Sequence, residues 1–166
     1  MLKICSIWMS MFCALFVAAA ALPAAADEPA YGEAQNREEE EFRQYFTDNM
    51  TRGVVKGMGF VGKQATPEQQ MKIREIIYTA FPEILARLRQ AGLYDEYKEQ
   101  LSDPDIRRLD DQAMDARTMQ EVLALNKRQM EITRTKRPRL YKFMNSDPEL
   151  GGIVMRMMQK IAAVCK

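Results

Sequence analysis

The stretch GMGFVGKQ, which starts at Gly57, contains glycine spacings that are typical of nucleotide-binding loops. Gly57, Gly59 and Gly62 match the dinucleotide turn G-x-G-x-x-G, and with Lys63 they come close to the triphosphate loop G-x-x-x-x-G-K. That second loop needs Ser or Thr after the lysine to hold magnesium, but this chain has Gln64. Both loops also need a strand before the turn. Because the preceding residues have helical spacing, we expect a helix end and a loop here, with no nucleotide.

Catalytic side chains are scarce. The chain has no histidine, so it lacks the side chain used most often for acid–base chemistry near neutral pH, which is also the commonest zinc ligand. A hydrolase would have to use carboxylates such as Asp110 and Asp111, and nothing in their spacing pairs them across a cleft. We therefore expect no enzyme, no metal site and no cofactor, and a carboxylate-based hydrolase is the weakest hypothesis.

Sulfur offers one more kind of chemistry, because Met155, Met157 and Met158 come shortly before Cys165. Such soft ligands select copper(I). Met157 and Cys165 also fall on the apolar stripe of the last expected helix, so we favour core packing. Methionine has a third use, since flexible methionine-rich surfaces bind varied apolar segments. Cys165 is the only cysteine beyond residue 26, so it is either buried or available for an intermolecular bond.

A run of basic residues lies in the last third of the chain, and Glu131 is the only acidic residue within it. The basic residues are Lys127, Arg128, Arg134, Lys136, Arg137, Arg139 and Lys142. One interpretation is an anionic partner, such as a lipid headgroup or an acidic protein. The alternative, which we favour, is a solvated helix end that faces the acidic residues Glu38 to Glu41.

The first 26 residues have the pattern of an export signal. Lys3 precedes an apolar run from Ile4 to Leu22, and Pro23 with three alanines follows. Small residues after a helix breaker are typical of a signal peptidase site, so we expect cleavage after Ala26 and a periplasmic or secreted protein. The run is long for a signal core, so an uncleaved anchor stays as the alternative. Lys3 is the only charged residue before Asp27, so the rest of the chain is formally neutral.

Helical spacing continues through the rest of the chain. Residues 27–35 read as a disordered lead-in, and a first helix is expected from Asn36. Thr66-Pro67-Glu68-Gln69 is a helix start with a capping box, and Ile73 to Leu88 provide one broad apolar face. Pro82 lies inside this second helix and predicts a kink or short break.

Two more helix starts contain proline. SDPD begins at Ser102 and SDPE at Ser146. Between Gly92 and the first of these we expect a short helix, and the helix after Asp103 should run to about Lys136. No segment alternates as a strand would. The expected fold is all-α, about five amphipathic helices in a bundle, with residues 36–166 forming a single helical domain.

The segment from Ala65 to Gln69, followed by Met71, Ile73 and Ile76, resembles the L-T-x-x-Q helix start of small periplasmic stress chaperones, with Ala65 in place of leucine. The same segment, with Leu101 to Leu109, is similar to a family of small exported helical domains of unknown function. Both resemblances imply an exported, non-catalytic helical domain. The metal-sensing chaperones use histidine, so that activity is not implied.

These patterns predict a chaperone-like protein that binds apolar segments of a protein client or an envelope component. The expected groove lies between the helix from Pro67 and the helix after Asp103. Phe81, Met114 and Met119 are its expected contacts, and the anionic rim is formed by Arg134, Lys136 and Arg137. The alternative is a structural or adaptor subunit of an envelope assembly, linked through Cys165. We expect neither nucleic acid nor nucleotide as a partner, and contact with a membrane surface stays open.

Overall fold

The computed structural model describes residues 31–166, with side chains from residue 37 onward. This part of the chain is all-helical, as expected, but it contains seven helices where the sequence predicted about five. The additional helices arise because one expected helix is divided in two and because residues 138–146 form a helix of their own. The helices are α2 (Tyr31–Phe60), α3 (Pro67–Gln90), α4 (Tyr94–Ser102), α5 (Pro104–Asp115), α6 (Met119–Lys136), α7 (Pro138–Ser146) and α8 (Pro148–Val164).

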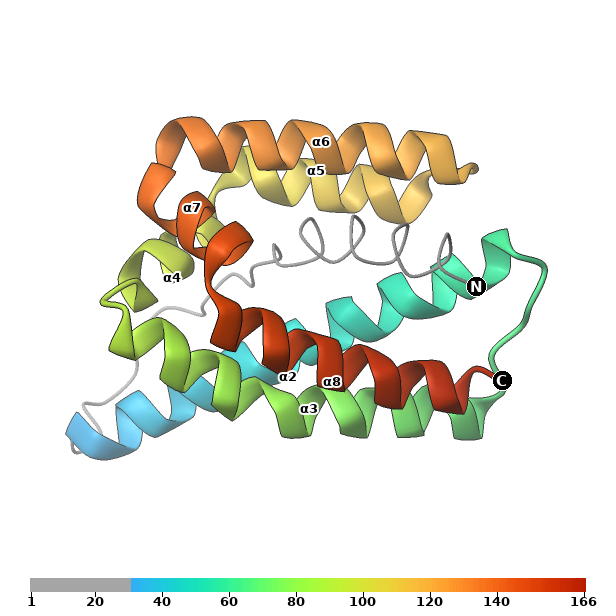
Figure 1. The fold of residues 1–166 in the computed structure, drawn as a ribbon, viewed down its shortest axis with the longest axis horizontal. Coiled ribbons are helices and arrows are strands. Elements are labelled where there is room, and N and C mark those ends of the chain that lie inside the picture. The colour runs from blue at the N-terminus through green and yellow to red at the C-terminus, as the bar shows by residue number, and fades with distance from the viewer. Residues whose placement is uncertain (1–30) are drawn as a thin grey trace.

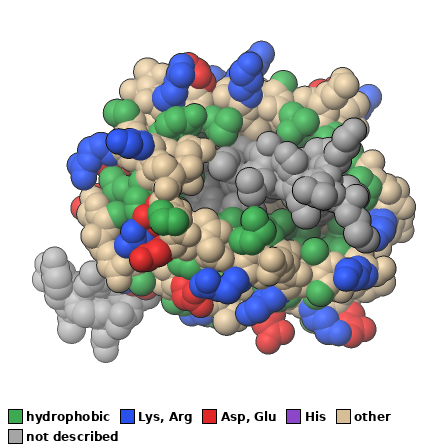
Figure 2. Space-filling view, in the orientation of Figure 1, with side chains coloured by type: hydrophobic (Ala, Val, Ile, Leu, Met, Phe, Trp, Pro, Cys, Tyr) green, Lys and Arg blue, Asp and Glu red, His purple; other side chains and the backbone are tan. Residues whose placement is uncertain are grey.

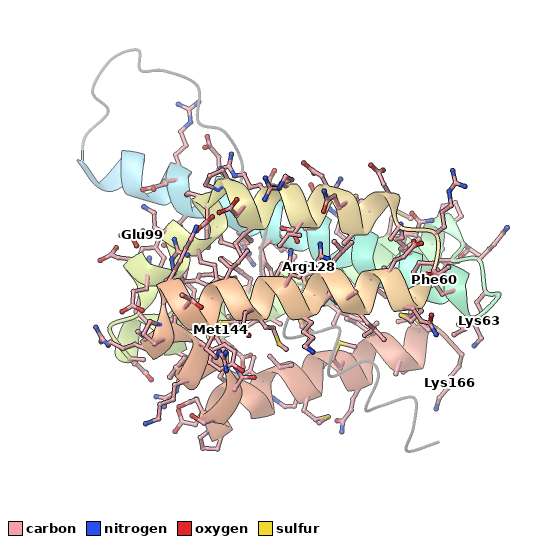
Figure 3. All side chains as sticks on the ribbon, turned by 90° about the horizontal axis from the view of Figure 1, so that it is seen from above. Phe60, Lys63, Glu99, Arg128, Met144 and Lys166 are labelled. Carbon is pink, nitrogen blue, oxygen red and sulfur yellow. The ribbon has the colours of Figure 1, made fainter. Side chains whose placement is uncertain are left out.

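The helices form two layers that are joined at one end (Figure 1). In the first layer α3 packs against both α2 and α8, and in the second α5 and α6 form an antiparallel hairpin. The short helices α4 and α7 connect the layers. Seen from above, Glu99 and Met144 mark this connected end, while Phe60, Lys63 and Lys166 lie at the opposite end (Figure 3). The end of α8 returns there, where Lys63 Nζ donates to the Cys165 carbonyl over 2.9 Å.

The apolar face predicted for residues 73–88 is the centre of the core. Thr66 caps α3 with the expected capping box, accepting a hydrogen bond from the Gln69 backbone while the Gln69 side chain accepts one in return. The residues of α3 that are buried follow steps of three and four, so they form one continuous stripe against α2 and α8. They are Ile73, Ile77, Phe81, Ile84, Leu85 and Leu88.

The sequence predicted a kink or a short break at Pro82, and the break does not occur, because α3 continues through this residue. Proline has no backbone N–H, so the carbonyl four residues earlier, that of Tyr78, lacks its helical donor. Arg43 of α2 takes that place, because its Nε donates to the Tyr78 carbonyl over 3.0 Å. The same guanidinium lies 3.5 Å from the centre of the Tyr78 ring. A contact with a neighbouring helix therefore supports the helix where its own sequence weakens it.

The helix expected from Asp103 to Lys136 is two helices. Thr118 begins α6 with a capping box: its hydroxyl accepts from the Glu121 backbone N–H over 3.2 Å, and the Glu121 carboxylate accepts from the Thr118 and Arg117 backbone N–H groups. Ala116 and Thr118 have extended backbone conformations, as the cap requires. The helix before the cap, α5, therefore ends at Asp115. The chain turns back at residues 116–118, and α5 and α6 pack side by side.

The glycine-rich stretch lies at the end of α2 and in the turn after it, as predicted. Gly57 and Gly59 are helical, and Gly62 has φ of +74°, the left-handed conformation that suits a helix end. The helix starts at Tyr31, before the expected Asn36. The predicted export signal, residues 1–26, lies outside the described residues. None of the helices between residues 31 and 166 has the length and apolar character that a membrane span requires.

Candidate functional site

The predicted groove contacts do not lie together. Phe81 is 1% exposed and packs against Phe46 and Phe42, with ring centres 5.1 and 5.7 Å apart. The Met114 carbonyl, by contrast, accepts a hydrogen bond from Lys56 near the other end of α2. Phe46 and Lys56 are about 15 Å apart along α2, because a helix rises about 1.5 Å per residue. Phe81 is thus a core residue of the first layer, and Met114 lies near the turn of the hairpin.

Most methionines beyond residue 26 are not fully buried. Met50, Met58 and Met157 are in the core, but Met71 and Met155 are 66% and 45% exposed. The remaining five are half-buried: Met114, Met119, Met130, Met144 and Met158. Met144 and Met158 pack against the core cluster, so core packing, the interpretation that we favoured from the sequence, accounts for five of these ten side chains.

Half-buried methionines share one flank of α6. Gln129 and Lys136 mark the side that meets α5, since they bind Asp110 and Asp103. Successive residues of a helix are about 100° apart around its axis. The side of α6 that meets α5 is therefore about a quarter of a turn or more away from Met119, Leu123 and Met130.

A similar stripe lies on α8, which starts after α7 and belongs to the other layer. At the end of α8, Cys165 contacts Met58 of α2. Val154 and Met158 lie on the same side of α8 as Cys165. Arg156 lies on the opposite side, where it pairs with Glu83 of α3. In space-filling view, apolar side chains lie on both layers, and Lys and Arg gather at the upper and lower margins (Figure 2). We call these residues of α6 and α8, together with the half-buried Met114 near the turn of the hairpin, the methionine face: Met114, Met119, Leu123, Met130, Val154 and Met158.

The basic run is partly neutralised within the fold. Lys136 and Arg137 both bind Asp103, at 2.9 and 3.1 Å. Burial alone would raise the pKa of Asp103, but the hydrogen bonds from these two side chains outweigh it and lower the pKa below its usual value. Arg134 pairs with Glu131 on the exposed side of α6. Lys136 and Arg137 therefore hold α5 to α6, and Arg134 is the most accessible member of the predicted rim.

The acidic residues at the start of α2 pair with residues of α3 and α4, whereas the sequence predicted that the basic run would face them. Glu38 binds Lys98 of α4, and Glu39 binds Arg89 of α3 over 2.6 Å. Glu40 accepts from the Tyr78 hydroxyl over 2.8 Å, which with Gln44 lowers the pKa of Glu40. These carboxylates fasten α2 to the helices beside it.

A polar seam lies between α2 and the hairpin. We define it as Tyr45, Asn49 and Arg52 of α2, Arg107 and Asp110 of α5, and Gln129 of α6. Gln129 is 1% exposed, and its Nε2 donates to Asp110 Oδ1 over 2.6 Å. Burial raises the pKa of Asp110 to about 7, against the opposing effects of Gln129 and Arg52. Burial also raises the pKa of Tyr45 to about 12. Asp110 thus titrates near neutral pH.

The seam was missed from the sequence because its partners come from three helices. Apolar spacing in the sequence alone favours Met119, Leu123 and Met130 as the inner stripe of α6. The most buried residues of α6 are mainly polar instead: Val122, Asn126, Gln129 and Thr133. Their spacing of four, three and four residues is helical, so a search for buried polar residues at that period would have found them.

Asp110 has little around it that would serve catalysis. Its second oxygen, Oδ2, is buried without a partner among the described residues. Asp111, its neighbour in sequence, is exposed. A small cavity of about 10 Å³ lies on the far side of Gln129, between α4, α6 and α7, and it is large enough for roughly one water molecule. The geometry offers a titrating contact between α5 and α6.

Cys165 is half-buried at the end of α8. Its thiol lies 3.5 Å from the Met58 sulfur. Burial raises the pKa of the thiol, and nearby Lys63 opposes the shift. A raised pKa keeps the thiol protonated at neutral pH, which slows attack on another sulfur. The structure thus places Cys165 in contact with the core, as core packing predicts, while part of its surface stays accessible.

Comparison with protein families, with curated proteins and with solved structures found no match to the chain. Within residues 31–166 no group of three or more His, Cys, Asp or Glu side chains is placed to hold a metal ion. The candidate site therefore rests on the geometry of two features, the methionine face and the polar seam.

Proposed function

We propose that the protein is an exported, non-catalytic binding protein that holds apolar segments of a protein client or an envelope component on the methionine face. One observation carries the proposal: seven methionines beyond residue 26 are half-buried or exposed, although methionine is a core residue in most proteins. Its unbranched, polarisable side chain adapts to partners of different shape. A surface rich in methionine suits a protein that binds many apolar sequences.

The placement of the face supports a helical or extended client. α6 ends and α8 begins at the connected end of the molecule, where α7 joins them, and both helices extend to the opposite end. A client segment lying along these helices would contact Met119 and Leu123 on one side and Val154 and Met158 on the other. Arg134 and the exposed Lys127 and Arg128 would stand near the margin, where they suit acidic groups that flank an apolar segment.

The test is suppression of aggregation of an unfolded client. The protein should suppress aggregation at a substoichiometric ratio and should bind an apolar dye in its folded state. Exchanging Met119 and Leu123 together for Lys should weaken both effects at least tenfold, because charge on the face opposes apolar contact. Met71→Lys, at an exposed methionine outside the face, is the matched control and should keep both effects. Failure of the wild-type protein in both assays would overturn the proposal.

A further inference from the structure

The small cavity beside Gln129 lies at the connected end of the molecule, where α4, α6 and α7 meet. Its volume of about 10 Å³ is close to the smallest space that holds one water molecule. The side chains that line it come from all three helices and include Gln100, Gln129 and Tyr141. None of the lining side chains is charged at neutral pH, so an ion there would have no counter-charge. The cavity therefore suits a neutral ligand of the size of water.

The contacts of Gln129 determine which end of its amide is directed at the cavity. Its Nε2 lies 2.6 Å from Asp110 Oδ1 and 3.5 Å from the Ile106 carbonyl oxygen, both of α5. The carbonyl can only accept a hydrogen bond, as can the ionised carboxylate, so the amide nitrogen of Gln129 must face α5. The amide oxygen, Oε1, therefore faces away from α5, on the side of the cavity. This oxygen is buried without a hydrogen-bond partner among the described residues.

A second amide on the cavity has the same deficit. Gln100 of α4 is 1% exposed, and its Oε1 is also buried without a partner in the described part of the chain. A buried acceptor that receives no hydrogen bond destabilises the folded state, so such atoms nearly always have a partner. Two acceptors of this kind, on different helices and beside one cavity, require a ligand that donates two hydrogen bonds.

We propose that the cavity binds one ordered water molecule, which donates one hydrogen bond to Gln100 Oε1 and one to Gln129 Oε1. The Thr133 hydroxyl cannot replace it as a donor, because its proton is used by the Gln129 carbonyl over 3.0 Å. Tyr141, which also lines the cavity, has a hydroxyl that can donate to the oxygen of the water. The water then makes about three hydrogen bonds, the usual number for buried water. It joins α4 to α6 within the end that connects the two layers.

Relaxation dispersion of water oxygen-17 in solutions of the full chain tests the site, because it counts water molecules that stay bound while the protein tumbles. Gln100→Met keeps the length of the side chain and removes its amide, so the dispersion amplitude should fall by the equivalent of one water. Gln112→Met, at an exposed glutamine of α5, is the matched control and should keep the wild-type amplitude. Equal amplitudes in the wild-type protein and in Gln100→Met would overturn the proposal.

A crystal structure of the wild-type protein keeps the test decisive if Gln100→Met does not fold. It should show one water within about 3.0 Å of both amide oxygens. A dry cavity, or a Gln100 amide that donates directly to Gln129 Oε1, would overturn the proposal. Neither measurement depends on the methionine face, so the water site and the proposed binding function can fail separately.

Discussion

The layer of α2, α3 and α8 and the α5–α6 hairpin are both built from capped amphipathic helices, but they bury different side chains. The buried residues of α3 are aliphatic or aromatic without exception, whereas three of the four buried residues of α6 are Asn, Gln or Thr. A helix buried through apolar groups stays in place, because separating it exposes that surface to water. A helix buried through polar groups can exchange its partners for water. We infer that apolar burial holds the first layer, whereas α6 is held to its neighbours more by polar contacts.

The largest expected effect tests this difference directly. Phe81→Ala should lower the free energy of unfolding by about 3–5 kcal/mol, because it leaves a cavity where Phe42 and Phe46 pack. Val122→Ala in the hairpin should cost only about 1–2 kcal/mol, for the loss of two carbons at a similarly buried position. Denaturant unfolding of both variants measures the two costs. Equal costs would mean that the hairpin is as much a part of the core as α3.

A smaller effect concerns Pro82, the weak point in the first layer. Arg43→Ala should cost about 1–2 kcal/mol, since it leaves the part-buried Tyr78 carbonyl without a donor. In a Pro82→Ala background the new backbone N–H supplies that donor, so the same substitution should cost less by roughly 1 kcal/mol. A double-mutant cycle with denaturant unfolding gives the coupling. Additive costs would show that Arg43 acts only through its contact with the Tyr78 ring.

The smallest expected effect lies in the turn of the hairpin. Thr118→Ala removes the cap of α6 and should cost about 1 kcal/mol. Thr66→Ala removes the matching cap of α3 and should cost a similar amount, because the two capping boxes have the same geometry. The two variants should differ in hydrogen exchange: Thr118→Ala should raise exchange in α5 and α6 alone. Exchange raised throughout the chain would show that the hairpin unfolds together with the first layer.

The first layer could be predicted from the sequence because its local and tertiary signals agree. Thr66, Pro67 and Gln69 mark the start of α3, and the apolar spacing that follows matches the side that is buried. A break at Pro82 does not occur, because the missing backbone donor is replaced by Arg43, which is distant in sequence. Phe81 was expected at a binding surface because periodicity places a residue on an inner side without saying which neighbour covers it.

The hairpin could be predicted only in part. Apolar residues continue at helical spacing across residues 116–118, so the capping box of Thr118 and Glu121 was the one local sign of a turn. The raised pKa of Asp110 depends on α2 and α6, and the neutralised charges of Lys136 and Arg137 depend on Asp103. Such properties are set by packing between helices, which no short stretch of sequence contains.

The methionines provide the most direct test, because they occur in both regions and each methyl group gives its own NMR signal. Titration of the full chain, labelled with carbon-13 at its methionine methyls, with an uncharged apolar helical peptide at pH 8 should shift Met114, Met119, Met130 and Met158. The core residues Met50 and Met157 should stay unchanged. Shifts confined to the exposed Met71 and Met155, or no shifts at all, would contradict binding of apolar segments on the methionine face.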